Sequence, residues 1–230
     1  MTETPAYTAA QVRAAEQPLL EAGEPLMARA SSALAQIARE EADAATARIL
    51  VLAGSGNNGG DALFAAAQLA EEHSVDVLVI GTRAHEHGVA AAVAAGARWV
   101  DLAAVRDGVG DYDLVLDGIL GIGSTGSTAL RGVAREAVKT LLPAVGAGRP
   151  RVIAVDLPSG LHPDTGECDH AVLPASVTVT FGAVKTGLVR GRGAELAGDI
   201  VLVDIGLTPQ LESVEPELTA TIARIVEPPA

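Results

Sequence analysis

The stretch VLAGSGNNGGDALFAAAQLAEE, residues 51–72, contains the pattern that best indicates the fold of this chain. It begins with an apolar run, passes through a turn with four glycines and two adjacent asparagines, and ends in an alanine-rich amphipathic segment. A buried strand, a glycine-rich loop and a helix in this order are typical of a nucleotide-binding α/β unit. The same order recurs more faintly at residues 112–143, as two such halves would give.

Short β-branched runs alternate with alanine-rich helical segments beyond this stretch, which predicts a mostly parallel sheet with helices on both faces. The expected strands are ARILVLAG (47–54), VDVLVIGT (75–82), ARWVDL (97–102), YDLVLDGI (112–119), RVIAVDLP (151–158), ASVTVTFG (175–182) and DIVLVDIG (199–206). Residues 8–45 should form two helices, with Pro18 and residues 23–25 as break signals. We expect an α/β fold, a three-layer α/β/α Rossmann-like sandwich with N-terminal helices, in a single domain over residues 1–230. AVGAGRPR (144–151) and the tail from residue 215 onward should be exposed connections.

The composition argues against nucleic-acid and membrane partners. The net charge of −13 argues against nucleic acid, because neutralising a phosphate backbone requires clustered Lys and Arg. Cys168 is the single cysteine, which excludes an intrachain disulfide and fits a reducing compartment; we interpret it as an incidental loop thiol. No stretch approaches the length of a membrane helix and no signal peptide is recognisable, so we expect a cytoplasmic protein without a membrane partner.

Two glycine patterns follow predicted strands. Gly54, Gly56 and Gly59 satisfy G-x-G-x-x-G, and Gly121, Gly123 and Gly126 satisfy it again. Dehydrogenases also place an acid at the end of the second strand for the ribose, whereas residues 80–83 read IGTR here. A nucleotide-dependent oxidoreductase or methyltransferase is therefore a weaker alternative.

Polar side chains stand at the carboxyl ends of three predicted strands. Asn57, Asn58 and Asp61 follow the first, Asp117 ends a second, and Asp156 ends a third. Two acids at strand ends of one sheet could divide the work, one paired with a cation and the other transferring protons. The alternative is structural: the asparagines shape a turn and the acids cap helices or turns.

Four segments in this order, GSGNNGGDA, DGILGIGSTG, AVDLPSGLHPDTGE and TVTFGAVKTGL, resemble the NAD(P)H-hydrate epimerase family, the YjeF N-terminal domain. The resemblance extends to LLEAGEPLMARASSALA near the N-terminus and covers most of the chain. Ala62, where glycine usually follows NNGGD, and Ser31 are small departures from the pattern.

The resemblance implies an isomerase that interconverts the R and S epimers of hydrated NADH or NADPH, in the repair of nicotinamide nucleotides. It also implies one K⁺ per subunit, with ligand positions at Asn58, Asp117 and Ser159. The implied substrate contacts are Asn57, Asn58, Gly59, Gly60, Asp61, Gly121, Ile122, Gly123, Ser124, Thr125, Gly126, Ser127 and Asp156. Amide, carboxylate and hydroxyl oxygens suit a hard monovalent cation, so the residue chemistry agrees with this ion site.

Epimerisation at a carbinolamine carbon requires either that the hydroxyl leaves and returns on the other face or that the ring opens and recloses. Both routes need proton transfer, and we take Asp156 as the candidate catalytic acid/base. Lys185 matches a lysine of the family pattern, and its role stays open.

The rival class is a binding or dimerisation module of the same fold without epimerase chemistry, but such a module would have less reason to keep Asp117 and Asp156. The resemblance further implies a homodimer and a fused or separate ADP- or ATP-dependent dehydratase. The sequence leaves open the preference between NADH and NADPH hydrates, where Arg83 could meet a 2′-phosphate, and whether the chain stands alone.

Overall fold

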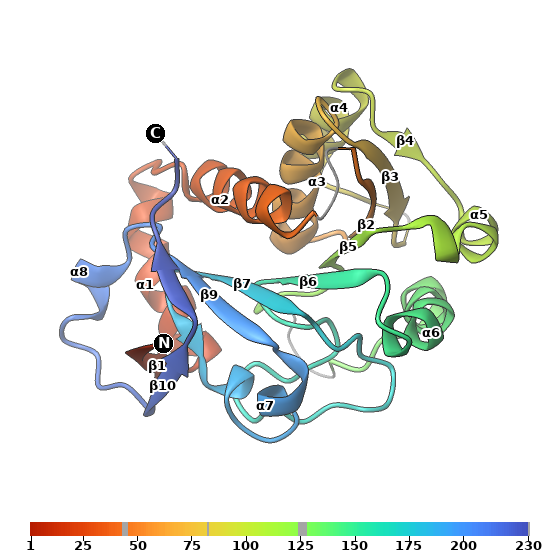
Figure 1. Ribbon diagram of the computed structural model, residues 1–230. Coiled ribbons are helices and arrows are strands. Elements are labelled where there is room, and N and C mark those ends of the chain that lie inside the picture. Colours follow the sequence, from red (N-terminus) through yellow and green to blue (C-terminus); the bar gives the residue numbers. More distant parts are fainter. Residues whose placement is uncertain (43–45, 82, 124–127, 230) are drawn as a thin grey trace.

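The computed structural model describes the whole chain except residues 43–45, 82, 124–127 and 230. Its main sheet has eight strands (Figure 1). They are β2 (Arg48–Ala53), β3 (Ser74–Val79), β4 (Arg98–Trp99), β5 (Leu114–Gly118), β6 (Arg151–Val155), β7 (Val177–Phe181), β9 (Asp199–Val203) and β11 (Arg224–Val226). The order across the sheet is β11-β9-β7-β6-β5-β2-β3-β4, and each neighbouring pair is parallel. All seven expected strands are confirmed, and the α/β fold with them.

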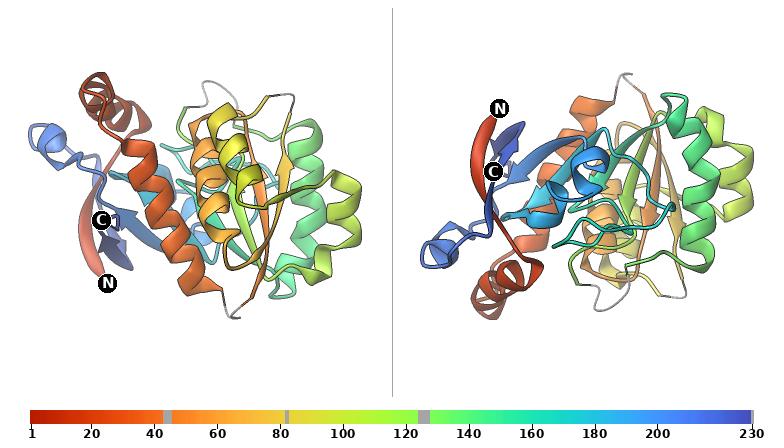
Figure 2. Two further views of the ribbon diagram at one scale, coloured as in Figure 1. Left: turned by 90° about the horizontal axis from the view of Figure 1, so that it is seen from above. Right: turned by 90° about the horizontal axis from the view of Figure 1, so that it is seen from below.

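Helices cover both faces of this sheet. They are α1 (Ala9–Glu21), α2 (Leu26–Glu41), α3 (Asn57–Leu69), α4 (Glu86–Ala94), α5 (Leu102–Asp107), α6 (Gly132–Gly146), α7 (Gly193–Leu196) and α8 (Thr208–Leu211), with 3-10 turns at Val109–Asp111 and Thr186–Leu188. Figure 2 shows α2, α3 and α4 on one face and α5 and α6 on the other. The two expected N-terminal helices are confirmed, although Pro18 lies within α1 and the break falls at residues 22–25.

Two apolar cores form because strand side chains alternate between the faces of the sheet. In β2, Ile49 and Val51 belong to the larger core beneath α2 and α3, whereas Leu50 and Leu52 belong to the core beneath α6. Burying one such side chain contributes about 1.5–3 kcal/mol. Aliphatic residues and alanine supply nearly all of both cores, so layer packing rather than aromatic anchoring holds the fold together.

A second, three-stranded sheet was not predicted from the sequence, and it corrects the expectation for the tail. Its order is β10 (Leu218–Ile222), β1 (Thr2–Tyr7), β8 (Val184–Lys185). No strand was expected at the N-terminus, and the tail was expected to be an exposed connection; instead β1 pairs antiparallel with β10 and parallel with β8. The tail prediction was wrong because β10 and β11 pair with strands from distant parts of the sequence, and a local pattern does not carry that information. AVGAGRPR was also partly misjudged, since α6 runs to Gly146.

The order of strands reverses between β2 and β5. From β2 the chain proceeds to β3 and β4 on one side of the sheet, while β5, β6, β7 and β9 follow on the other side. In such sheets the loops at the carboxyl ends of the two central strands separate and leave a crevice. Asp117 of β5 pairs in register with Leu52 of β2, so the loops that follow them lie on either side of this point.

Within the described part of the chain, no helix combines the length and the apolar character that crossing a membrane requires.

Candidate functional site

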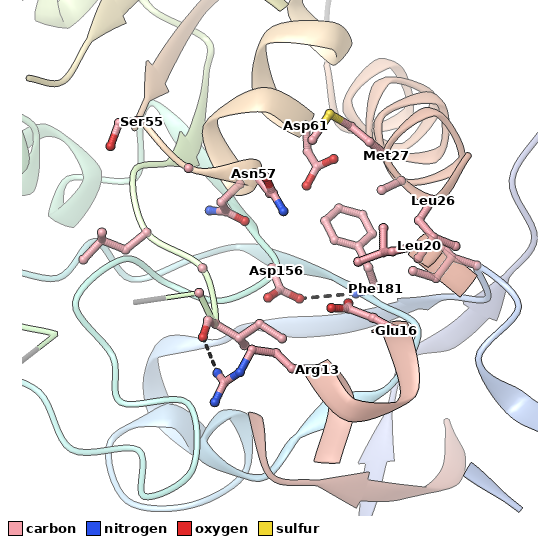
Figure 3. A pocket seen from close by; sticks show the side chains of 18 of the residues that line it. Arg13, Glu16, Leu20, Leu26, Met27, Ser55, Asn57, Asp61, Asp156 and Phe181 are labelled. Carbon is pink, nitrogen blue, oxygen red and sulfur yellow. Dashed lines mark hydrogen bonds between the residues drawn. The ribbon is translucent and has the colours of Figure 1, made fainter. Parts of the chain in front are cut away.

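A cavity of about 520 Å³ opens at the carboxyl edge of the sheet, at the point where the strand order reverses (Figure 3). Residues from α1, α2, the β2–α3 turn, the loop after β5 and the strand ends surround it. They are Arg13, Glu16, Leu20, Leu26, Met27, Ala30, Ser55, Gly56, Asn57, Asn58, Asp61, Ile119, Leu120, Gly121, Ile122, Gly123, Asp156, Phe181 and Ile205. The lining combines apolar side chains with a few amide and carboxylate groups, which is typical of a small-molecule site.

The β2–α3 turn brings the first turn of α3 against the end of the sheet. Gly56 is the N-cap, so Asn57 and Asn58 begin the helix, and Asn57 is exposed to the cavity. The helix can approach this closely only because Gly54 and Gly59 lack side chains. A Cβ on Gly54 would lie 1.9 Å from Ile119 O, and one on Gly59 would lie 2.0 Å from Gly54 O. The backbone amides of the first turn are thereby available to an anion.

Gly59→Ala should destabilise the fold by about 1–3 kcal/mol, the usual cost of overpacking, even though alanine favours helix. The added methyl group meets backbone atoms, which cannot move aside as the end of a side chain can. Gly56→Ala is the matched control, because a Cβ there meets nothing within 4 Å. Urea unfolding of both variants checks this; equal stability of the two would contradict it.

Asp61 lies one turn into α3 and points into the cavity from above (Figure 3). It is 8% exposed, and its Oδ1 has no hydrogen-bond partner among the described residues. Burial, followed by the negative charges of Asp156 and Glu16, raises the pKa of its carboxyl well above the ordinary value, and Lys185 opposes the shift only in part. No side chain caps α3, so the structural alternative of a capping Asp61 finds no support here.

Asp61→Asn should raise the free energy of unfolding at pH 7, because the amide cannot ionise and burial disfavours the charged form of the parent carboxyl. The pKa of Asp61 is raised on folding, so the folded state keeps a proton that the unfolded chain loses above about pH 4. The parent protein therefore loses stability as the pH rises through this window, and the variant should not. Denaturation at several pH values should show a gap that widens with pH; a constant gap would argue against a carboxyl of this kind.

Asp156 follows β6 and faces Asp61 across the cavity (Figure 3). Its φ of 67° is left-handed, a conformation that costs a non-glycine residue energy and is often found at functional sites. This backbone turns the carboxylate toward Lys185, whose Nζ donates a short hydrogen bond to Asp156 Oδ1. Thr180 Oγ1 and Phe181 N also donate to the same oxygen, at 3.3 and 3.4 Å. Lys185 is 1% exposed, so the pair is a buried ion pair.

Asn58, Asp117 and Ser159 meet around the turn that follows β5. Ser159 N donates to Asp117 Oδ2 at 2.9 Å, and Leu120 N donates to Ser159 Oγ at 2.9 Å. Asn58 reaches the same turn, because a Cβ on Gly121 would lie 3.0 Å from Asn58 Oδ1. Burial raises the pKa of Asp117, and hydrogen bonds from Ser159 act against that shift. No described group of three or more His, Cys, Asp or Glu residues could hold a metal, so an ion here would depend on mixed oxygen ligands.

The structure places the expected substrate contacts at different depths. Asn57, Asn58, Asp61, Asp156 and residues 121–123 line the cavity. Gly59 and Gly60 do not line it and are buried against Gly54 and His85, while Asp117 and Ser159 are buried behind the loop after β5. Ser124, Thr125, Gly126 and Ser127 lie outside the described residues. Arg83 is exposed and away from the cavity lining.

Cys168 also lies away from the cavity lining. It is partly buried in the loop between β6 and β7, and burial raises the pKa of its thiol. A raised thiol pKa disfavours the nucleophilic thiolate, which agrees with an incidental loop thiol.

Arg13 and Glu16 of α1 are site residues that the sequence did not reveal. Arg13 Nη1 donates to Ile122 O at 2.6 Å, which fastens the helix to the loop after β5. Burial raises the pKa of Glu16, the positive charge of Lys185 lowers it, and the negative charge of Asp156 raises it further. The i, i+3 spacing places both side chains on one face of a helix, but nothing in the sequence indicated that this face covers the carboxyl edge of the sheet.

Comparison with known proteins gives three consistent findings. Residues 23–187 match the family described as YjeF-related protein N-terminus. A Microbacterium testaceum protein named NAD(P)H-hydrate epimerase is 56% identical over 225 residues, covering 97% of this chain and 87% of that protein. A Clavibacter michiganensis protein of the same name is 54% identical over 209 residues, covering 87% and 90%.

A more distant relative and a solved structure are also similar to this chain. The Mycobacterium tuberculosis protein named bifunctional NAD(P)H-hydrate repair enzyme Nnr is 37% identical over 87% of this chain, which corresponds to 41% of that protein. The crystal structure of yeast ynu0 superimposes with a TM-score of 0.72 at 18% identity, covering 94% of this chain and 97% of that one. At this identity the structural match shows a shared fold alone.

Proposed function

The chain belongs to the YjeF-related N-terminus family, and on this premise we propose that it is an NAD(P)H-hydrate epimerase. As an isomerase it interconverts the R and S epimers of hydrated NADH and NADPH. The observation that carries this function is the 56% identity to a protein of that name over 97% of the chain. The cavity supports it, because amide, carboxylate and backbone donor groups from three loops converge at the point where α/β sheets bind nucleotides.

In this proposal the reacting ring lies against Asp156, in the part of the cavity that apolar side chains border. Asp156 acts as the acid/base, because it reaches the cavity from a strand end and is held by three contacts, two hydrogen bonds from Thr180 and Phe181 and an ion pair with Lys185. Lys185 orients this carboxylate and is itself too deeply buried to bind the nucleotide. Leu20, Met27 and Phe181 offer apolar surface to the edge of the ring.

The phosphates belong near the start of α3 and the loop after β5. The first turn of α3 presents backbone amides at the positive end of the helix dipole, which suits an anion without any lysine or arginine. Gly121 and Gly123 line the same side of the cavity, and Arg13 holds Ile122 in place between them. On these grounds we assign Asn57, Asn58 and residues 121–123 to phosphate binding. Residues 59–61 and 124–127 are assigned to substrate binding on the family resemblance.

The residues around Asp117 fit a K⁺ ion. Asp117 is fully buried, and among the described residues it has no cationic side chain within ion-pairing distance. Asn58 Nδ2 is also buried and has no partner among the described residues. Rotating the amide by 180° would place its oxygen there as a ligand. Asn58, Asp117 and Ser159 would hold the ion. When bound, it supplies a fixed positive charge that neutralises Asp117 and braces the loop that receives the phosphates.

Replacing K⁺ by choline at constant ionic strength should lower the epimerisation rate by at least about tenfold, because Asp117 would then remain an uncompensated buried charge. Asp117→Asn should abolish most of the K⁺ response. Initial rates against KCl concentration measure both effects. The exposed Asp101→Asn is a control, and a K⁺ response in Asp117→Asn equal to that of the parent would contradict this ion site.

Chromatography that resolves the two epimers tests the function itself. A single epimer of hydrated NADPH should reach the equilibrium mixture far faster with the protein than without it, and hydrated NADH should be compared in parallel. Absorbance at the reduced-nicotinamide band should not change, because epimerisation involves no net oxidation or reduction. If the epimers interconverted no faster with the protein than without it, the protein would be better explained as a binding module.

Other attributes belong to the same proposal. Residues 1–230 form one domain of the YjeF N-terminal type, supported by the family match and by the small sheet that joins both ends of the chain. The protein acts in the cytoplasm as a homodimer. Its product is consumed by an ADP- or ATP-dependent dehydratase, on the same polypeptide or a separate one.

A further inference from the structure

Three carboxylates from three different elements enter the cavity. Glu16 comes from α1, Asp61 from α3 and Asp156 from the end of β6, and Figure 3 shows them around one common space. Only Asp156 has a direct ionic partner among the described residues, namely Lys185. Glu16 and Asp61 have no described Lys, Arg or His within ion-pairing distance. The cavity therefore presents more acidic groups to its occupant than its own cations can neutralise.

The two routes to epimerisation place different charges in this cavity. In ring opening, the hydroxyl loses its proton, the bond from the ring nitrogen to the hydroxyl-bearing carbon breaks, and the nitrogen gains a proton, so no net positive charge appears on the ring. In hydroxyl departure, the carbon–oxygen bond breaks with its electron pair on oxygen, which takes a proton and leaves as water. The nitrogen lone pair then forms a double bond to the carbon, and the ring becomes a cation.

Carboxylates stabilise a cation that forms between them, as in glycoside hydrolysis, where two carboxyl groups flank a positively charged sugar ring. Inversion at the carbon also requires a proton donor on one face of the ring and a proton acceptor on the other. Asp61 and Asp156 meet this requirement, because they approach the cavity from opposite sides, one from the helical layer and one from the sheet.

Resting on the proposed function, we propose that Asp61 and Asp156 act as a pair on opposite faces of a ring cation. Asp61 gives its proton to the departing hydroxyl, and water leaves. Asp156 takes a proton from a second water, which forms the new carbon–oxygen bond on its own face. In the reverse direction the two residues exchange roles, so no oxidant, reductant or other reactant is needed.

The surroundings of the two carboxyls suit these different resting roles. Asp61 Oδ1 is buried and has no hydrogen-bond partner among the described residues, and burial together with neighbouring negative charge raises the pKa of Asp61, which favours its protonated form. Asp156 instead lies against the ammonium group of Lys185 and accepts two further hydrogen bonds, so it is surrounded by donors. One group is thus equipped to donate a proton and the other to accept one.

Isotope labelling distinguishes the two routes. A single epimer of hydrated NADPH is incubated with the full chain and KCl in ¹⁸O-water and quenched at the first few per cent of conversion. The opposite epimer is then isolated and weighed by mass spectrometry. We expect each newly formed molecule to carry one ¹⁸O at the hydroxyl. New epimer with its original oxygen overturns the cation route and leaves the proposed function standing, whereas no enzymatic conversion overturns the proposed function and this inference with it.

The Asp61→Asn variant tests the assignment of the donor. Its kcat should fall at least about 100-fold, the lower range for a lost general acid, while the affinity for NADP⁺ stays within threefold of the parent. Glu71→Gln, an exposed acid just beyond the same helix, should keep the parent kcat. A folded Asp61→Asn variant with the parent kcat would overturn the pairing with Asp156.

Discussion

Replacing Asp156 by Asn should lower kcat for epimerisation by about 100- to 10,000-fold, the range expected for the loss of a positioned acid/base. Asparagine keeps the shape of the side chain, tolerates the left-handed backbone at φ 67°, and still accepts hydrogen bonds through its oxygen. It cannot accept the proton from water. Steady-state rates from epimer-resolving chromatography measure the effect.

The control for this variant is Glu167→Gln, an exposed acid in the loop that follows Asp156. It should retain the parent rate. Affinity for NADP⁺ should stay within about threefold in both variants, because we propose that the phosphates bind at the start of α3, away from Asp156. If Asp156→Asn turned over substrate at the parent rate, Asp156 would not be the acid/base and another group would have to serve.

Replacing Lys185 by Met should lower the free energy of unfolding by about 3–5 kcal/mol, because the change leaves Asp156 as a buried charge without its partner. Lys185 Nζ also donates to Thr180 Oγ1 at 3.2 Å and to Phe181 O at 2.9 Å, and these acceptors lose their donor as well. The turnover should fall with the stability, since the carboxylate loses the group that orients it. Urea unfolding gives the stability change directly.

Two further variants separate the ion pair from general packing. Adding Asp156→Asn to Lys185→Met should recover a large part of the lost stability, because the uncompensated charge disappears. Lys139→Met alters the other lysine of the chain, which is exposed on α6, and should change stability by less than about 0.5 kcal/mol. A double variant as unstable as Lys185→Met alone would show that the lysine acts through its packing and not through Asp156.

The parallel core of the fold was predictable because each strand carries its own signal. Continuous apolar runs such as Ile49–Ala53 and Val152–Val155 are buried on both faces, and they do not depend on any particular neighbour to be recognised. The glycine turn after β2 was equally clear. Its polar side chains and those after β5 and β6 had to meet once the sheet was parallel, since parallel strands end at one edge.

The remaining elements depend on distant partners. Thr2–Tyr7 contains a proline, and its residues are partly exposed and partly buried. It forms a strand only because β10 and β8 lie on either side of it. Glu16 looked like an ordinary helical acid until α1 was placed over the cavity. The partner of Lys185 was open for the same reason: the sequence separates it from Asp156 by a long loop and a strand, and only the packed sheet brings the two together.

The small sheet has a practical consequence for anyone who engineers this polypeptide. Tyr7 pairs in register with Lys185, and Thr2 to Ala6 of the same strand pair with β10, so the N-terminal strand links the lysine's strand to a strand near the C-terminus. Deleting the first seven residues would remove the central strand of this sheet. Lys185 would lose its neighbouring strand, and the position of its partner Asp156 would be disturbed. The side chain of Met1 is fully solvated, and β1 begins after it. An affinity tag attached ahead of Met1 should therefore leave the strand pairing intact.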